Sequence, residues 1–508
     1  MSAPAIAGGP APGALLGGAA EALREADLAR RHGFVSNLIG LIIEATGLQA
    51  EVGEVCLVGT DRGRAAVAAE VVGFRDGRTL LMPLGELHGI GPGTRVLASG
   101  APFRIAVGDS LLGRVLDGLG TPQDGRPLLV AQSDPTRPQD SPLLARSTIA
   151  TPPSALSRPR ITERVGLGVR ALDGLVPCGR GQRLGIFAGS GVGKSSLLGM
   201  IARSSSASIN VIALVGERGR EVREFIERDL GDALARSVVV VATSDQPALV
   251  RIKAAFTATT IAEYFRDQGH DVMLMMDSVT RFAMAQREVG LAIGEPPATR
   301  GYTPSVFALL PRLLERAGTS TSGSITALYT VLVDGDDMNE PIADAVRAIL
   351  DGHVVLTRSL AHAGHYPAID VLQSVSRLVG EIVPPEIERA GQQLRAALAV
   401  LREKEDLVAI GAYQPGSEPA LDTALAHRAR IERFLRQPVH EHSDPRQTDR
   451  RLLELGSSLA SELELRSGEI PDAEEVTPET GAGRGAHGGS DTFDVSGGPA
   501  IPTLGLSI

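Results

Sequence analysis

Short apolar runs alternate with longer segments of helical spacing through the middle of the chain. The apolar runs lie at 184–188, 211–215, 238–241, 272–276, 325–333 and 354–356, and the helical segments at 248–266, 279–292 and 342–350. Such runs are typical of buried strands, and strands that alternate with helices favour a parallel sheet covered on both faces. The pattern therefore predicts an α/β domain, which we place at 101–378.

The regions on either side of this domain have different patterns. Residues 33–100 hold short alternating segments at 54–58, 65–72 and 79–83, divided by glycine-rich turns, which predict a small β-barrel. Residues 101–160 are rich in proline and glycine and are expected to be a linker that wraps onto the α/β domain. After Pro385 the spacing is helical at 386–405, 420–436 and 448–465, which predicts a helical C-terminal domain over 379–466.

The two ends of the chain lack a sustained period. Residues 1–16 are rich in alanine, glycine and proline, and residues 467–508 are rich in glycine and serine, so both are expected to be disordered. Residues 19–31 are alanine-rich and charged, with Leu23 and Leu28 as apolar positions. This leader, part of a terminal region over 1–32, is either a flexible segment or a helix for docking and oligomerisation.

Composition excludes several classes of protein. The 508 residues are 43% hydrophobic and carry a net charge of −10, so the chain lacks the basic character of a nucleic-acid-binding protein. Cys56 and Cys178 are the only cysteines, which rules out a disulfide framework and favours a reducing compartment. No apolar stretch is long enough to span a bilayer, and no Lys or Arg precedes Arg24 as in a secretory signal. We expect a cytoplasmic protein.

The strand at 184–188 leads into the most informative motif of the chain. Alternating glycines and a Lys-Ser pair follow it, and then a helix begins. Glycine lets successive N–H groups curl around an anion, and the helix N-terminus adds partial positive charge. These features predict a phosphate-binding loop made of Gly189, Ser190, Gly191, Val192, Gly193, Lys194, Ser195 and Ser196.

Within this loop the residue types assign the chemistry. Lys194 is expected to reach the β- and γ-phosphates of ATP, and the Ser195 hydroxyl to ligate Mg²⁺. The usual pattern has glycine at 188, where this chain has Ala188; the alanine is tolerable if its φ is negative. A dinucleotide-binding G-x-G-x-x-G pattern fails, because Lys194 occupies the third glycine position.

Two carboxylates at predicted strand ends complete the candidate site. Asp277 ends the apolar run 272–276 and is expected to order the water shell of Mg²⁺. Glu217 follows the run 211–215, where a general base could activate water; a surface salt bridge to an arginine is the alternative. The histidines match no zinc-ligand spacing, so we predict no zinc site among His353, His362, His365, His440 and His442.

Several long motifs resemble those of the type III secretion ATPases, relatives of the catalytic subunit of rotary F-type ATP synthases. The motifs are Gly185 to Leu198, GERGREV from Gly216, DSVTRFAMAQREVGLAIGEPPATRGYTPSVFALLPRLLERAG from Asp277, and GHYPAIDVLQSVSRL from Gly364. The resemblance implies an N-terminal barrel, a RecA-like P-loop core and a helical C-terminal domain, assembled as a homohexamer. The segment VLVDGDDMNEPIAD from Val331 is more similar to the virulence injectisome branch than to the flagellar branch.

The same resemblance implies roles for individual residues. Glu217 would be the base, and Arg218 would approach the γ-phosphate. Tyr366 would stack on adenine, with Tyr413 as a second candidate. Arg377, in the SVSR segment, would be the arginine finger given to the neighbouring subunit, with a salt bridge inside its own subunit as the alternative.

The expected function is therefore ATP hydrolysis by a motor that energises type III protein secretion from the cytoplasmic face of the inner membrane. Such a motor would release export substrates from chaperones and promote their unfolding. The implied partners are a stator-like regulatory subunit, a central stalk protein, chaperone–effector complexes and the export gate. A flagellar export ATPase is the alternative, and a non-catalytic nucleotide-binding subunit and an RNA-dependent hexameric translocase are less favoured.

Overall fold

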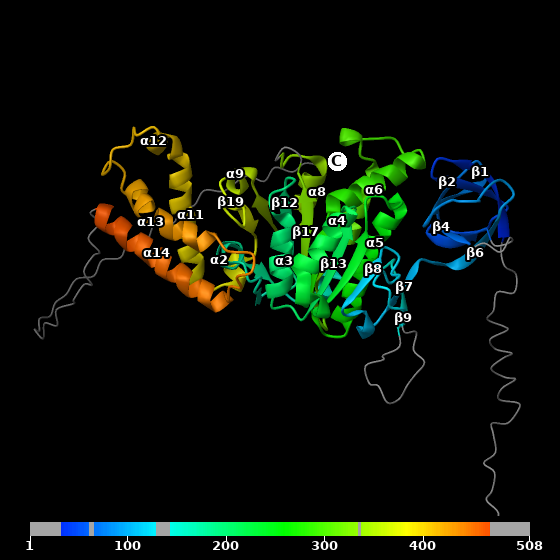
Figure 1. Cartoon of the computed structure of the whole chain (residues 1–508), viewed down its shortest axis with the longest axis horizontal. Helices are drawn as coiled ribbons and strands as arrows, with labels where there is room; N and C mark the ends of the chain where they lie inside the picture. The colour runs from blue at the N-terminus through cyan, green and yellow to red at the C-terminus, as the bar shows by residue number, and fades with distance from the viewer. Residues whose placement is uncertain (1–31, 60–65, 129–142, 334–336, 468–508) are drawn as a thin grey trace, which may run out of the picture.

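The computed structural model describes residues 32–59, 66–128, 143–333 and 337–467. These residues form three bodies in a row: a barrel, a sheet covered by helices, and a helical domain (Figure 1). The predicted fold class is confirmed. The predictions made for 1–31 and 468–508 lie outside the described residues.

A closed six-stranded barrel forms the N-terminal body, in the order β1-β2-β5-β4-β3-β6. Its strands are β1 (His32–Ile39), β2 (Ile42–Thr46), β3 (Glu54–Val58), β4 (Val67–Arg75), β5 (Arg78–Pro83) and β6 (Arg95–Pro102). The pattern predicted β3, β4 and β5 only. In β1 the alternation is broken, because Phe34 and Ile39 are exposed and the register shifts after Val35. An ion pair between buried Glu70 of β4 and Lys253 docks the barrel onto the next domain.

The central sheet has the order β19-β18-β12-β17-β15-β13-β14-β8, with the short β16 (Gly318–Thr319) paired to β17. The strands are β8 (Arg114–Asp117), β12 (Arg183–Ala188), β13 (Ile209–Val215), β14 (Ser237–Ala242), β15 (Asp271–Asp277), β17 (Ser324–Leu332), β18 (Gly352–Leu356) and β19 (Ile369–Ser376). The five predicted runs after 184–188 all form strands here, and from β18 to β8 the strands of the main path are parallel.

Two features of the sheet correct the sequence predictions. The stretch 101–160 is not only a linker, because its strand β8 pairs with β14 as the outermost strand. Only four residues long and followed by the glycine at 118, β8 is too short to show a period. The sheet is also not wholly parallel, since β19 runs antiparallel to β18. As an edge strand β19 mixes buried and exposed positions, and no continuous apolar run marks it.

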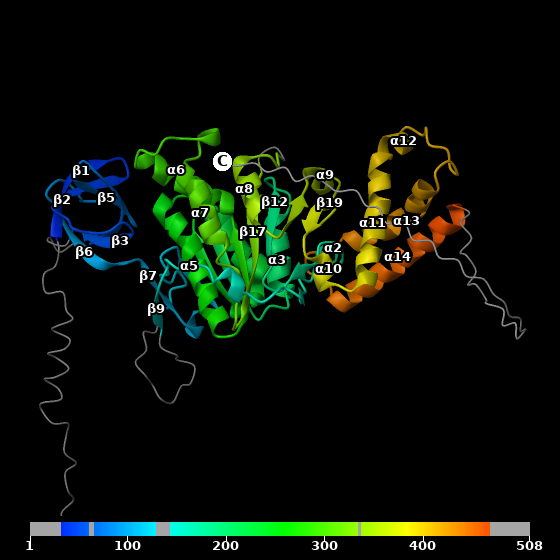
Figure 2. The ribbon, with the colours of Figure 1, turned by 180° about the vertical axis from the view of Figure 1, so that it is seen from behind.

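Helices cover both faces of the sheet, because successive residues of each strand point to opposite sides. In β13, Val211 and Ala213 join one apolar core, and Ile212 and Leu214 join the other. One face carries α5 (Ala248–Asp267), α6 (Val279–Ala292), α7 (Pro304–Leu314) and α8 (Pro341–Ile349), which Figure 2 shows in front of the sheet. The other carries α2 (Arg170–Leu175) and α3 (Lys194–Ser204).

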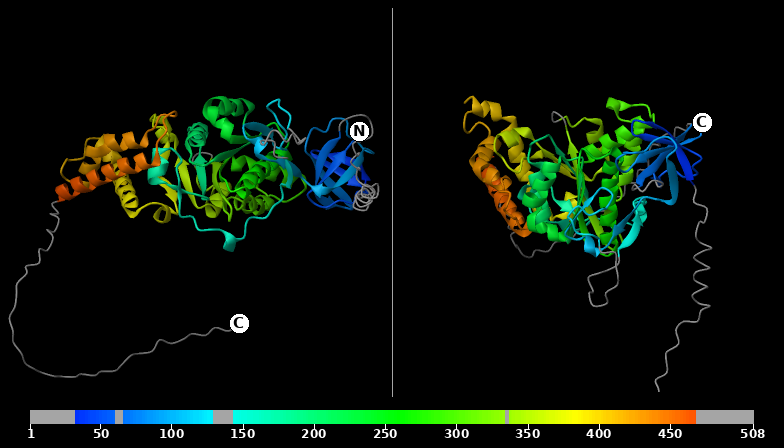
Figure 3. Two further views of the ribbon diagram at one scale, coloured as in Figure 1. Left: turned by 90° about the horizontal axis from the view of Figure 1, so that it is seen from below. Right: turned by 45° about the vertical axis from the view of Figure 1, so that its right-hand side comes forward.

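The C-terminal body contains α11 (Pro385–Glu403), α12 (Glu405–Ala409), α13 (Pro419–Leu435) and α14 (Pro445–Ser467). Each of the three longer helices begins with proline, which suits a first turn whose N–H groups have no intrahelical partner. Figure 3 shows this body at one end of the molecule and the barrel at the other. Across the described residues, no helix combines the length and the apolar character that crossing a bilayer would need.

Candidate nucleotide-hydrolysis site

The candidate site lies at the carboxyl ends of three central, parallel strands. We call this end of the strands the phosphate-loop edge of the sheet. β12 leads into the phosphate loop, β13 leads into Glu217, and β15 ends in Asp277. β13 and β15 are neighbours, and one strand, β17, separates β15 from β12. Because ligands of open α/β sheets bind at the carboxyl ends of strands, this edge is the expected position for a nucleotide.

The phosphate loop has the backbone that its sequence predicts. Gly191 and Gly193 have φ values of 80° and 92°, in the left-handed region that favours glycine. A side chain at Gly191 would meet no atom within 4 Å, so conformation and not space requires glycine there. Ala188 is a buried strand residue, and among the described non-glycine residues only Asp76 and Arg300 have positive φ. The departure at 188 therefore costs no backbone strain. The helix α3 begins directly at Lys194.

The Lys194 ammonium group lies between the two carboxylates. It forms an ion pair with Asp277, and its Nζ is 3.7 Å from Oε1 of Glu217. Asp277 is 3% exposed and also accepts a hydrogen bond of 2.8 Å from the Thr330 hydroxyl. The arrangement brings together the cation, the base and the metal-ordering carboxylate that the sequence predicted.

Glu217 is the carboxylate suited to take up a proton. Burial and the nearby charge of Asp277 raise its pKa to about 7, and the ammonium group of Lys194 opposes that rise. Its Oε1 is buried and has no hydrogen-bond partner. A carboxylate with an unpartnered oxygen and a pKa near neutrality can accept a proton from water. The structure pairs Glu217 with Lys194, and among the described residues Glu217 forms no salt bridge with an arginine, which was the alternative.

Arg281, near the start of α6, is a residue that the sequence argument did not single out. Its side chain packs against Gly216, where an added Cβ would lie 2.9 Å from the arginine Cβ. Its Nε is buried without a hydrogen-bond partner, and its charge opposes the rise in the pKa of Glu217. Arg281 lies in the DSVTRFA stretch that carries the family resemblance, but no local pattern places its side chain beside Glu217. Arg218, by contrast, is 76% exposed and pairs with Glu221 at 3.0 Å.

Tyr366 lies beside the phosphate loop, although 172 positions separate it from Lys194 in the chain. Two of its ring carbons are 3.5 and 3.6 Å from the point where a Cβ on Gly193 would stand. The residue is 45% exposed, which leaves room for a planar group to approach it. Tyr413 is not brought to the loop: it follows α12 in the helical domain, where its hydroxyl donates to the Glu418 carbonyl at 3.2 Å.

Arg377 lies at the opposite edge, where the parallel strands begin. Leu356 pairs with both Ala188 and Ile369 at the phosphate-loop edge, whereas Gly352 pairs with Ser376 four residues away. Four strand residues span roughly 13 Å, so Arg377 is remote from the Lys194 of its own subunit. Its side chain is exposed and donates to the Arg347 carbonyl at 3.4 Å. Among the described residues Arg377 forms no ion pair, so the alternative of a salt bridge within the subunit is not seen.

The residues present fit a Mg²⁺ ion that arrives with a nucleotide. Ser195 lies exposed in the first turn of α3, and Asp277 ends the strand two positions away in the sheet. The described residues contain no group of three or more His, Cys, Asp or Glu side chains that could hold a metal by themselves. An ion at this edge would depend on phosphate oxygens and water, which Mg²⁺ prefers to an all-protein cage.

Comparisons with known proteins agree with this geometry. Three family models match: the ATP synthase alpha/beta beta-barrel domain over 35–100, the ATP synthase alpha/beta nucleotide-binding domain over 168–376, and the T3SS EscN ATPase C-terminal domain over 383–454. The flagellum-specific ATP synthase of Bacillus subtilis is 54% identical over 82% of this chain and 93% of its own length. The type 3 secretion system ATPase of Xanthomonas euvesicatoria is 51% identical over 82% and 91%.

The chain belongs to the family of type III secretion and flagellum-specific ATPases. Its fold matches the assembled ATPase EscN from the enteropathogenic E. coli type III secretion system, with a TM-score of 0.77 and 46% identity over 84% of this chain and all of EscN. EscN has also been solved in complex with its central stalk EscO. Family membership confirms the predicted resemblance and supports ATPase activity for this chain.

Proposed function

We propose that the chain hydrolyses ATP as the motor subunit of a type III export apparatus. The observation that carries the proposal is the grouping of Lys194, Glu217 and Asp277 at one sheet edge, where a Glu217 oxygen 3.7 Å from the lysine accepts no hydrogen bond from the described residues. A subunit that bound nucleotide without turnover would not need this buried base. The complete set of groups therefore favours catalysis over a non-catalytic role.

The side chains divide the reaction among themselves. Lys194 exchanges its Asp277 partner for the β- and γ-phosphates when ATP enters, since both partners are anionic. Asp277 is then free to order water around the metal, and Thr330 keeps its carboxylate in place. Glu217 accepts the proton of the attacking water. Bound Mg²⁺, held by Ser195 and ordered by Asp277, would neutralise phosphate charge. Arg218 is exposed enough to turn toward the γ-phosphate.

A single subunit holds an incomplete site, because Arg377 lies on the far edge of its own sheet. We infer a homohexamer in which Arg377 of one subunit approaches the phosphates of the next. An arginine supplied in trans stabilises the charge that spreads over the transferring phosphoryl oxygens. The assembled state of the relative EscN supports this arrangement.

Partners and location follow from the same reasoning and belong to the proposal. A central stalk protein would bind the assembled subunits, since the relative EscN has been solved in complex with its central stalk EscO. The other proposed partners are a stator-like regulatory subunit, chaperone–effector complexes and the export gate. The motor would work in the cytoplasm at the inner membrane.

Both machines that use this family are represented among the relatives. We propose the injectisome on the segment from Val331, and the flagellar export apparatus is the alternative. Restoring secretion in a strain that lacks its injectisome ATPase, but not motility in one that lacks the flagellar ATPase, would support the proposal. The reverse result would assign the chain to flagella.

The function itself is tested by the rate of phosphate release from ATP by purified protein, with and without added RNA. Turnover that RNA leaves unchanged supports an export ATPase. Turnover that requires RNA would instead identify a translocase, and no turnover in a folded, assembled protein would identify a non-catalytic subunit.

A further inference from the structure

The linker between α13 and α14, residues 436–444, belongs to the helical domain and contacts the nucleotide domain. Its central residue is Gln437, which is 2% exposed although it belongs to an irregular segment. The backbone N–H of Gln437 donates to the Tyr366 carbonyl at 3.0 Å. The helical domain therefore contacts the residue proposed to receive the adenine ring.

All hydrogen-bonding groups of the Gln437 amide have partners. The side-chain oxygen accepts from the backbone N–H of Arg170 at 2.8 Å. The NH₂ group donates at 2.8 Å to the carbonyls of Gly168 and Glu441. A buried amide that lost these partners would be costly, so the bonds define one position for the residue. The guanidinium of Arg170 adds bonds to the carbonyls of Phe434 and Arg436, on the N-terminal side of Gln437.

The same linker contacts the helix of the phosphate loop. Arg203, in the last turn of α3, donates to the Val439 carbonyl at 2.6 Å. Since α3 begins at Lys194, the linker binds two parts of the site: the phosphate-loop helix through Arg203, and Tyr366 through Gln437.

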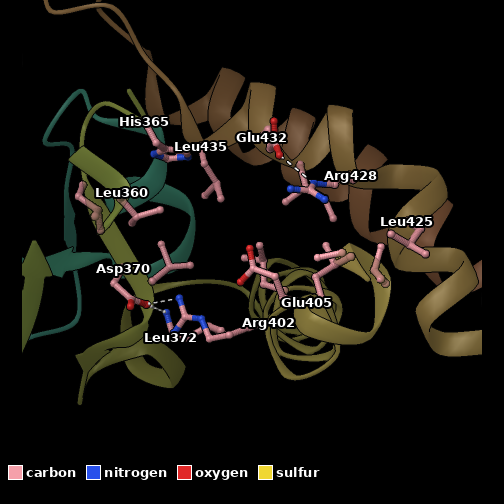
Figure 4. Close-up of a pocket in the computed structure, with 17 residues that line it drawn as sticks. Leu360, His365, Asp370, Leu372, Arg402, Glu405, Leu425, Arg428, Glu432 and Leu435 are labelled. Atoms are coloured by element: carbon pink, nitrogen blue, oxygen red, sulfur yellow. Dashed lines mark hydrogen bonds and ion pairs between the residues drawn. The ribbon is translucent and has the colours of Figure 1, made fainter. Parts of the chain in front are cut away.

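The Tyr366 ring has little else to hold it. In the part of the chain that the structure describes, its hydroxyl has no hydrogen-bond partner and its ring has no aromatic neighbour. A cavity of about 390 Å³ lies between β19 and the helices α11 and α13, and His365 is among the residues that line it. Figure 4 shows His365, which precedes Tyr366, and Leu435 at one end of this cavity, and Arg402 paired with Asp370 at its floor. The position of Tyr366 thus depends on its backbone.

We propose that Gln437 is a positioning residue for the nucleotide base: its side-chain bonds fix the linker, and the linker's N–H fixes Tyr366 against the phosphate loop. This inference rests on the proposed role of Tyr366 in adenine stacking. Gln437 itself would not touch ATP. Its loss should weaken recognition of the base and leave the phosphate chemistry intact.

The test is a double-variant comparison of Gln437→Ala, Tyr366→Ala and the combined variant in the full-length protein. Stacking is worth about 0.5–1.5 kcal/mol, so Gln437→Ala should raise the KM for ATP about two- to tenfold, with kcat unchanged within about twofold. Inhibition by inorganic triphosphate, which has no base, should keep its wild-type strength. In the Tyr366→Ala background the substitution should add nothing further. Gln447→Ala, on the exposed surface of α14, is the matched control and should leave KM unchanged.

The outcomes separate the two claims. If Gln437→Ala raises KM equally with and without Tyr366, or weakens inorganic triphosphate as much as ATP, the positioning role is wrong and Gln437 is merely structural. If Tyr366→Ala itself leaves KM unchanged, the stacking role in the proposed function is wrong. Should Gln437→Ala not fold, Gln437→Met takes its place: it fills the same space, loses the acceptor and both donors, and should give the same pattern.

Discussion

The carboxyl ends and the amino ends of the parallel strands form two edges of the central sheet, and these edges carry different charged groups. At the phosphate-loop edge, a lysine and two carboxylates are buried together, and each contacts another within the subunit. At the other edge Arg377 is exposed, and its guanidinium donates to the Arg347 carbonyl. The first edge holds the groups that we propose bind ATP and activate water, whereas the second carries a cation that forms no ion pair among the described residues. The proposed function accounts for this difference by assigning nucleotide binding to one subunit and the completion of catalysis to Arg377 of the next.

The largest effect is expected at the first edge. Lys194→Ala should abolish hydrolysis and most nucleotide affinity, because the phosphates lose their direct cation and Asp277 is left facing them. The measurements are phosphate release and equilibrium binding of a fluorescent ATP analogue. Substantial residual turnover would show that Lys194 does not serve the phosphates.

Arg377→Ala sharpens the comparison, because it should separate binding from catalysis. The rate should fall by about 10³–10⁵, the worth of an arginine finger, while ATP affinity stays within a few-fold of wild type. Lys194→Ala is the control that loses both. An equal loss of affinity in the Arg377 variant would place the arginine in the binding step.

Glu217→Gln should retain ATP binding and lower turnover by roughly 10²-fold or more, since the amide keeps the shape and removes the base. Affinity and rate measured on the same preparation decide the matter. A parallel collapse of affinity would make Glu217 a structural residue.

The pH profile gives the control for this role. A general base acts only when deprotonated, and burial raises the pKa of Glu217 to about 7. Wild-type kcat/KM should therefore rise as the pH increases through about 7 and fall below it. In the residual activity of Glu217→Gln this dependence should be absent.

The smallest effect is expected at the adenine side. Tyr366→Ala should weaken nucleotide binding only two- to tenfold, because stacking contributes about 0.5–1.5 kcal/mol beyond buried area. ATP and GTP should be affected alike, since stacking reads a ring face and not an edge. An unchanged affinity for both would move the base contact elsewhere.

The sequence predicted the phosphate-loop edge well, because its residues lie in local motifs. Each of Lys194, Glu217 and Asp277 follows an apolar run, and parallel strands bring their carboxyl ends to one edge. β8 was missed because four residues show no period, and β19 because an edge strand is partly exposed. The antiparallel direction of β19 places Tyr366 near the phosphate loop and Arg377 far from it, and the local sequence pattern does not reveal that direction.

Contacts between domains were beyond the sequence for a different reason. Gln437 is polar and lies in a segment without a period, so its near-complete burial depends on partners that are distant in the chain, such as Gly168 and Arg170. Arg281 was hidden in a helical pattern, and its relation to Glu217 arises only when α6 packs behind Gly216.

The central claim is that Arg377 acts on the site of another subunit, and mixing two inactive variants tests it most directly. Lys194→Ala keeps an intact arginine, and Arg377→Ala keeps an intact phosphate loop, so mixed rings contain some interfaces with both. Under conditions where subunits exchange, the mixture should recover ATPase activity that neither variant has alone. Proven co-assembly without any recovered activity would contradict the account.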